Sequence, residues 1–152
     1  MTSTLGLYKK ITVLPLGSKA FSFFFARKAR YFTSIKPSVL AMEPHFAQVR
    51  IPKRKAVHNH IGTVHAIAVC NGLEAAMGLL AEATVPADMR WLPKGMDVNY
   101  LAKSTSDITC TATTSPADWE KAPDVPVTVT ATREDGTVVV SGTIRLWVTP
   151  KS

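Results

Sequence analysis

The stretch that decides the fold lies in the middle of the chain and reads VHAIAVCNGLEAAMGLLAEA, residues 64–83. Small and apolar residues dominate it, and Pro86 follows shortly afterwards. A run of about five turns with this composition predicts a buried helix that ends before the proline. The run is nearly long enough to span a membrane, but Asn71 and Glu74 interrupt its centre, where a carboxylate is costly in lipid. We therefore expect the core helix of a globular domain.

The segments on both sides of this helix are typical of strands. Two runs of β-forming residues precede it, with Glu43-Pro44 as a turn between them. After it, apolar and polar residues alternate, Glu134-Asp135-Gly136 predicts a hairpin turn, and Gly142 predicts a bulge in the last strand. The sequence thus predicts an α+β fold of six antiparallel strands, with the helix between the second and third. The expected strands cover residues 34–42, 45–51, 96–100, 108–113, 127–133 and 138–148.

Length and composition fit a single globular domain. The sequence has 152 residues, of which 46% are hydrophobic and 19% charged, so it can bury a sizeable core. Its two cysteines, Cys70 and Cys110, lie 40 positions apart and form no Cys-x-x-Cys pair. This spacing argues against a disulfide scaffold, a zinc ribbon and a redox dithiol. We therefore expect a cytoplasmic protein.

The charge is unevenly distributed along the chain. Residues 1–55 contain eleven basic residues and one acidic residue, whereas residues 56–152 contain seven basic and ten acidic residues. A basic front attracts polyanions such as nucleic acid, anionic lipid or the phosphates of a nucleotide-bearing cofactor. No recognisable nucleic-acid-binding motif accompanies the basic residues, so we expect no nucleic-acid partner.

The N-terminal segment, residues 1–31, contains two short apolar runs flanked by lysine and arginine. Both runs are too short for a membrane span, and no Ala-x-Ala cleavage pattern follows them. We expect one or two amphipathic helices packed on a single domain that covers residues 32–152. Peripheral contact with a membrane surface through Phe23, Phe24 and Phe25 is the alternative interpretation.

The segment directly before the central helix, His58 to Ala66, concentrates polar and flexible residues. The amide groups in the first turn of a helix lack partners within the helix, so a helix N-terminus can bind an anion. In acyl transfer this anion is the oxygen of the tetrahedral intermediate. The alternative is a Gly-containing turn in which Thr63 is the helix N-cap.

Glu74 is the candidate for acid–base chemistry. It lies within the most apolar part of the helix, between Leu73 and Ala75, and no basic residue occurs at helical contact spacing. Apolar surroundings disfavour the charged form of a carboxylate and make it a stronger base. The alternative is that Glu74 faces solvent or pairs with an arginine from elsewhere in the fold.

These residues together resemble a known motif. Asn59-His60-Ile61-Gly62-Thr63-Val64-His65-Ala66, followed by Glu74, is similar to the Asn-x-x-Gly-Thr-x-His-Gly-Gly motif and helical acid of hot-dog-fold acyl-CoA thioesterases of the phenylacetyl-CoA thioesterase type. From about Ser34 to Val148, the chain resembles an uncharacterised, largely bacterial branch of that superfamily.

The resemblance implies a hot-dog fold, in which a six-stranded antiparallel sheet wraps around one long central helix, here with an N-terminal helical extension. It also implies a homodimer whose sheets join edge to edge, with active sites at the subunit interface, and pairs of dimers can form tetramers. The implied substrate is an acyl-CoA ester, with coenzyme A as part of the substrate, no separate cofactor and no metal.

The resemblance also assigns roles to individual residues. Glu74 would be the general base or nucleophile, Asn59 would position the carbonyl or the attacking water, and the Ala66 amide would form the oxyanion hole beside His65. Ala66-Ile67 replaces the usual Gly-Gly pair. The substrate-binding residues would be Gly62 and Thr63 in the loop, Lys53, Arg54 and Lys55 near the phosphates of coenzyme A, and Ala102, which stands where many relatives have Ser or Thr.

Three other functions compete with a thioesterase. A hot-dog dehydratase would need a different arrangement of His and acid, and His45-Phe46-Ala47 lacks the expected following proline. A non-catalytic acyl-CoA-binding or lipid-binding protein would share every feature of the fold. A membrane-surface or nucleic-acid-binding protein would use the basic front. Met77, with Phe46 and Leu80, is a candidate for lining an acyl tunnel, although core packing is the default interpretation.

Overall fold

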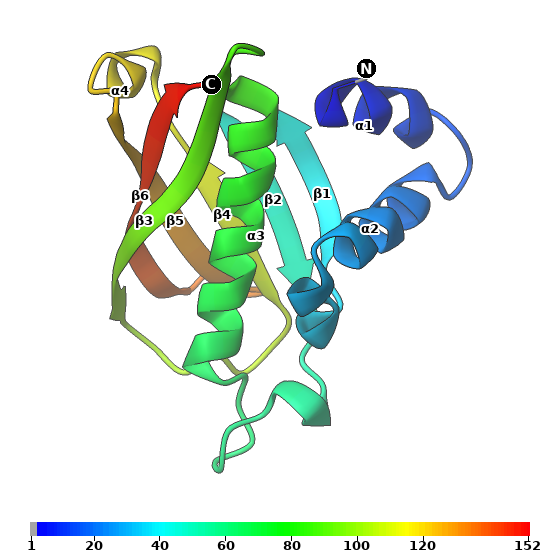
Figure 1. Cartoon of the computed structure of the whole chain (residues 1–152). Helices are drawn as coiled ribbons and strands as arrows, with labels where there is room; N and C mark the ends of the chain where they lie inside the picture. The colour runs from blue at the N-terminus through cyan, green and yellow to red at the C-terminus, as the bar shows by residue number, and fades with distance from the viewer. Residues whose placement is uncertain (1–2) are drawn as a thin grey trace.

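The computed structural model describes residues 3–152, and these form a six-stranded sheet, a long helix and an N-terminal helical extension that covers residues 4–35 (Figure 1). The strands are β1 Ser38–Glu43, β2 Phe46–Ile51, β3 Met89–Tyr100, β4 Ile108–Thr113, β5 Asp124–Arg133 and β6 Val138–Pro150. The helices are α1 Thr4–Thr12, α2 Gly17–Lys28, α3 Ala66–Thr84 and α4 Pro116–Trp119, together with the 3-10 helices η1 Arg30–Ile35 and η2 Lys55–Val57.

The sheet has the strand order β1-β2-β4-β5-β6-β3, and every neighbouring pair is antiparallel. It curves around α3, which lies on one of its faces (Figure 1). The expected α+β class is confirmed, as are the six antiparallel strands and the position of the helix between the second and third. This architecture is the hot-dog fold that the sequence motif implies.

Some expected element boundaries are wrong for identifiable reasons. Residues 34–37 are not part of the first strand, because η1 continues to Ile35 and Lys36 has a positive φ of 47°. The third strand begins at Met89 rather than at residue 96, since its edge position tolerates Pro93. Gly142 does not form a bulge: it pairs in register with Val98 and Val129, and a side chain there would collide with the backbone of β3.

The short helix α4 was not expected from the sequence, although it carries a recognisable start signal. Ser115 and Asp118 form a capping box, in which the Asp118 carboxylate accepts hydrogen bonds from the Ser115 amide at 2.8 Å and hydroxyl at 2.9 Å. The backbone hydrogen bond from Ser115 is the largest of the contacts that lower the pKa of Asp118 to about 2. A carboxylate thus stabilises this helix start at neutral pH.

Helix α3 is the centre of the hydrophobic core. Eleven of its nineteen residues are buried, so it behaves as a core helix even though its length and hydropathy would suit a membrane span. Gly72 allows α3 to pack closely on the sheet, because a Cβ atom there would lie 2.7 Å from the sulfur of Cys110 on β4 and 3.3 Å from Ile51 on β2. Gly78 has more space, with the Trp91 ring 3.5 Å from the equivalent Cβ position.

The N-terminal extension covers the β1 edge of the sheet (Figure 1). The Ser18 hydroxyl donates to the Val39 carbonyl at 3.0 Å, and the Ser22 hydroxyl accepts from the Val39 amide at 2.8 Å. Phe21 is fully buried and packs edge-on against Tyr8 of α1, with ring centroids 5.0 Å apart. The expected amphipathic helices are present, and they share the hydrophobic core of the sheet and α3.

Strand β3 forms the opposite edge of the sheet. Within residues 3–152 it pairs only with β6, along almost its whole length. Leu92 on this strand is 62% exposed. A long edge strand with exposed apolar residues is a template for pairing with another chain.

The two glycines of α3 give a matched test of this packing. We expect Gly72→Ala to destabilise the protein by about 1–3 kcal/mol, because the added methyl group overpacks the contact with Cys110 and Ile51. Gly78→Ala should instead be neutral or stabilise it by up to about 1 kcal/mol, since alanine favours a helix and the space is available. Urea unfolding of both variants measures the difference, and equal stabilities would contradict the close contact at Gly72.

Candidate active site

The loop before α3 is held together by the side chain of Asn59. Its Oδ1 atom accepts hydrogen bonds from the amides of Ile61 at 3.1 Å and Thr63 at 3.0 Å, and its Nδ2 donates to the Thr63 hydroxyl at 2.8 Å. Gly62 has a φ of 78°, a conformation that favours glycine. Asn59, Gly62 and Thr63 therefore build the loop, and at most one Asn59 N–H remains for a substrate or water.

The N-cap of α3 is His65 rather than Thr63, so the expected Thr63 cap is wrong. Thr63 is buried and bonded to Asn59, whereas Nδ1 of His65 accepts a hydrogen bond from the Ile67 amide at 3.0 Å. The His65 amide donates to the Val57 carbonyl at 2.8 Å and thereby fixes the ring at the helix start. His65 thus orients the first turn of α3.

The backbone amides that follow His65 differ in whether they have a hydrogen-bond acceptor. The Ile67 amide is taken by His65, whereas the amides of Ala66 and Ala68 have no acceptor within the described part of the chain. Ala66 lines a pocket of about 310 Å³ between the loop, the end of β3 and β6. Asn59, Thr63 and Ala102 line the same pocket, so the structure brings these four expected site residues together.

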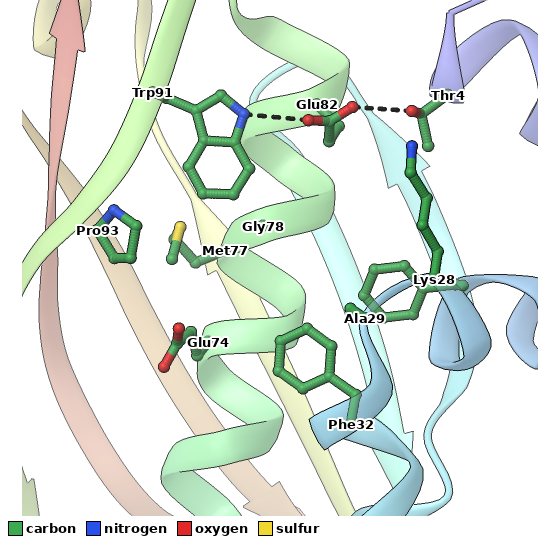
Figure 2. Close-up of a pocket in the computed structure, with 11 residues that line it drawn as sticks. Thr4, Lys28, Ala29, Phe32, Glu74, Met77, Gly78, Glu82, Trp91 and Pro93 are labelled. Atoms are coloured by element: carbon green, nitrogen blue, oxygen red, sulfur yellow. Dashed lines mark hydrogen bonds between the residues drawn. The ribbon is translucent and has the colours of Figure 1, made fainter.

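Glu74 lines a different pocket, which lies between α3, β3 and the N-terminal extension (Figure 2). The expectation that Glu74 is buried is wrong, because the residue is exposed, although the pocket that it lines is mostly apolar. Its neighbours Leu73 and Ala75 are buried and lie on other sides of the helix. Its carboxylate has no hydrogen-bond or ion-pair partner among residues 3–152, and it is therefore free to act on a bound molecule.

Ala66 and Glu74 lie in different pockets of one chain. Their positions on α3 are eight residues apart, which corresponds to about 12 Å along the helix axis at 1.5 Å per residue. One chain therefore presents a helix start with a free amide at one pocket and a free carboxylate at another.

The basic residues expected near coenzyme A divide into two kinds. The Arg54 guanidinium donates a hydrogen bond to the Ser34 carbonyl, and this contact ties the loop to the N-terminal extension. Lys53 and Lys55 are exposed. Arg54 thus has a structural contact, while the two lysines are available for a phosphate.

Cys70 lies one turn before Glu74, and its sulfur is 3.8 Å from the Tyr100 hydroxyl. Burial raises the pKa of the Cys70 thiol, so the residue is not an activated nucleophile. No group of three or more His, Cys, Asp or Glu residues within the described chain is arranged to hold a metal ion.

The sequence did not identify the wall of the Glu74 pocket. Met77 lines this pocket as one interpretation suggested, but Phe46 and Leu80 do not. Phe25 and Phe32 come from the N-terminal extension, and Trp91 comes from β3. No local pattern links these positions, because only the folded chain brings them beside Glu74.

Comparisons with known proteins identify the family. A family model described as Domain of unknown function (DUF4442) matches residues 17–148. A solved structure described as genomics APC5556 is 38% identical, with a TM-score of 0.86 over 97% of this chain and 99% of the other. No curated protein matches the chain significantly.

Two more distant solved structures carry functional descriptions. A protein of unknown function and probable thioesterase from Pseudomonas aeruginosa is 18% identical, with a TM-score of 0.75 over 91% of this chain and 97% of the other. A thioesterase family protein from Silicibacter pomeroyi is 20% identical, with a TM-score of 0.69 over 86% of this chain and 99% of the other. The chain belongs to the DUF4442 family and has the hot-dog fold of these thioesterase-like structures.

Proposed function

We propose that this protein is an acyl-CoA thioesterase. The proposal rests on one observation. Among the described residues, two groups of α3 lack a hydrogen-bond partner: the Ala66 amide at its start and the Glu74 carboxylate further along. A helix start can stabilise an oxyanion, and an unpaired carboxylate can serve as a general base. The similarity of the fold to thioesterases supports this reaction over other uses of the same groups.

The reaction follows from these two groups. Glu74 accepts a proton from water, and the water oxygen forms a bond to the thioester carbonyl carbon. The Ala66 N–H donates to the oxyanion of the tetrahedral intermediate. Collapse of the intermediate breaks the C–S bond, and the leaving thiolate takes the proton from Glu74. The thiolate of coenzyme A leaves readily, so the site needs no strong acid.

We infer that the working site forms between two chains. Ala66 and Glu74 are about 12 Å apart along α3 and line different pockets, which favours a site that takes one group from each chain. The open β3 edge offers a surface through which two sheets can join as a homodimer. In such a dimer, Glu74 of one chain acts on a thioester held at the α3 start of its partner.

A non-catalytic acyl-CoA-binding protein is the second candidate, and two observations favour it. Ile67 is 56% exposed directly after Ala66, where related motifs have glycine, so its side chain narrows the approach to the Ala66 amide. Ala102 lines the Ala66 pocket without the hydroxyl group that Ser or Thr would supply. Both candidate functions predict that acyl-CoA binds, so a measurement of thioester turnover is needed to distinguish them.

Removal of either group should abolish the turnover of acyl-CoA esters, measured as release of free thiol. Glu74→Gln removes the base while keeping the size of the side chain. Ala66→Pro removes the N–H at the first helical position, where proline is well tolerated. His65 already has the extended conformation that precedes proline, with ψ 137°. We expect Ala66→Pro to lose roughly 10²–10³-fold in kcat, the usual effect of one oxyanion donor, and Glu74→Gln to lose roughly 10²–10⁴-fold, the usual effect of a general base.

Thermal unfolding of both variants controls for folding, since neither should lose much stability. If a substitution leaves the rate of thiol release at the wild-type value, the role assigned to the group that it removes is contradicted. Absence of turnover by the wild-type protein across short, medium, long and aromatic acyl esters would favour the acyl-CoA-binding protein.

The shared site predicts complementation between two inactive variants. A heterodimer of one Glu74→Gln chain and one Ala66→Pro chain contains one site in which both groups are intact. We expect the purified heterodimer, isolated through two different affinity tags, to recover about half of the wild-type rate, because one of two symmetric sites works. No recovery would mean that both groups act within one chain or that no such dimer forms.

A further inference from the structure

The pocket beside Glu74 has a volume of about 360 Å³, within the usual range for a small-molecule site. The N-terminal helices form one side of it, with residues of α1, α2 and the start of η1, while α3 is the floor and β3 the other side (Figure 2). Most of its lining is apolar or aromatic. These lining residues are Phe25, Ala29, Phe32, Met77, Gly78, Trp91 and Pro93.

We propose that this pocket binds the acyl group of the substrate and selects an uncharged, apolar chain or aryl group. The inference rests on the proposed function, since Glu74 is the group that acts on the thioester. It goes further by making the N-terminal extension one wall of the acyl site and by naming the class of acyl group.

The shape of the pocket fits an extended chain. Glu74, Gly78 and Glu82 follow one another at four-residue spacing along α3, so the positions of the two glutamates are about 12 Å apart along the helix axis. Gly78 lies midway and has no side chain. A Cβ atom there would meet only the Trp91 ring, at 3.5 Å, so the glycine leaves the middle of the pocket open.

The aromatic rings give the pocket a firm wall. Phe25 of α2 and Phe32 of η1 stack with ring centroids 5.4 Å apart and an angle of 19° between their planes. Trp91 faces them from β3 across the floor (Figure 2). Its indole N–H donates to Glu82 at 3.2 Å, which holds the ring in place. Alkyl and aryl groups pack well against such rings.

The charges of the pocket disfavour an acyl group that ends in a carboxylate, because its lining contains two carboxylates, Glu74 and Glu82, and one ammonium group, Lys28. Glu82 lies at the end away from Glu74, and it also accepts a hydrogen bond from the Thr4 hydroxyl at 2.8 Å. A chain that starts at Glu74 therefore approaches a second carboxylate at its far end. Lys28 is the one basic residue of the lining, and it is exposed. Like charges at close range disfavour an anionic chain.

Variants that change the space in the pocket test the acyl site. Gly78→Leu should fill its middle and lower the ratio of decanoyl-CoA to acetyl-CoA turnover at least tenfold. Phe25→Ala should widen the pocket and raise that ratio or the use of bulkier aryl esters. Phe23→Ala is the matched control, because Phe23 lies on the same helix but is 66% exposed and does not line the pocket. It should leave the ratio unchanged.

Binding must be measured independently of turnover, by calorimetry with non-hydrolysable acetyl-CoA and decanoyl-CoA thioether analogues. One outcome is that binding depends on chain length, that Gly78→Leu and Phe25→Ala alter this dependence, and that the wild-type protein releases no thiol. This outcome would support the acyl pocket and overturn the thioesterase. The other outcome is that the wild-type protein releases thiol and that neither variant, although folded, alters the chain-length profile. This outcome would overturn the acyl pocket but not the thioesterase.

A charge variant tests the selection against anionic chains. Wild-type protein should prefer hexanoyl-CoA to adipyl-CoA, which carries a carboxylate at its far end. Glu82→Gln should reduce this preference at least fivefold, whereas Glu120→Gln, on the exposed surface beyond α4, should leave it unchanged. An equal preference in wild type and Glu82→Gln would overturn the assigned role of Glu82.

Discussion

The close packing of α3 on the sheet is the constraint on which the rest of the structure depends. Gly72 allows the helix to approach Cys110 and Ile51, and the buried residues of α3 then fill the concave face of the sheet. This contact sets the rotation of the helix about its axis. Since the residues that face the sheet are fixed, Glu74 must lie on the side turned toward β3 and the N-terminal extension.

The two edges of the sheet differ in whether other parts of the chain cover their backbone groups, and this difference bears on the proposed function. Ser18 and Ser22 of α2 satisfy the free backbone groups of Val39 at the β1 edge. Within residues 3–152, no strand pairs with the outer edge of β3. The proposed pairing between chains would therefore use β3, which is the edge that borders the Glu74 pocket through Trp91 and Pro93. The N-terminal extension closes one edge and at the same time shapes the pocket.

Much of the fold could be predicted because its signals are local. The apolar run of residues 64–83 and the alternating segments after it predicted the helix, the strands and their order along the chain. The Asp135-Gly136 turn likewise predicted the final hairpin, which the register of β5 and β6 confirms. The first half of β3 was missed because Pro93, Lys94 and Gly95 are poor strand formers. Its pairing with β6 outweighs their weak preference.

The candidate site could be predicted only in part, because some of its properties depend on contacts between distant segments. The motif identified the loop and the helix start, and the structure brings Asn59, Thr63, Ala66 and Ala102 to one pocket. The burial of Glu74 was wrongly inferred from its sequence neighbours, because the residue is exposed. Leu73 and Ala75 are apolar, but successive residues of a helix point in different directions, so they say little about what faces the carboxylate.

Helix geometry also explains why the proposed acyl pocket and the proposed oxyanion donor lie apart in this chain. One chain supplies the described lining of the Glu74 pocket, from α1, α2, the start of η1, α3 and β3. The proposed oxyanion donor, by contrast, belongs to Ala66, which lies two turns away along the same helix and lines another pocket. The proposed hydrolysis therefore takes the acyl pocket from one chain and the helix start from a second.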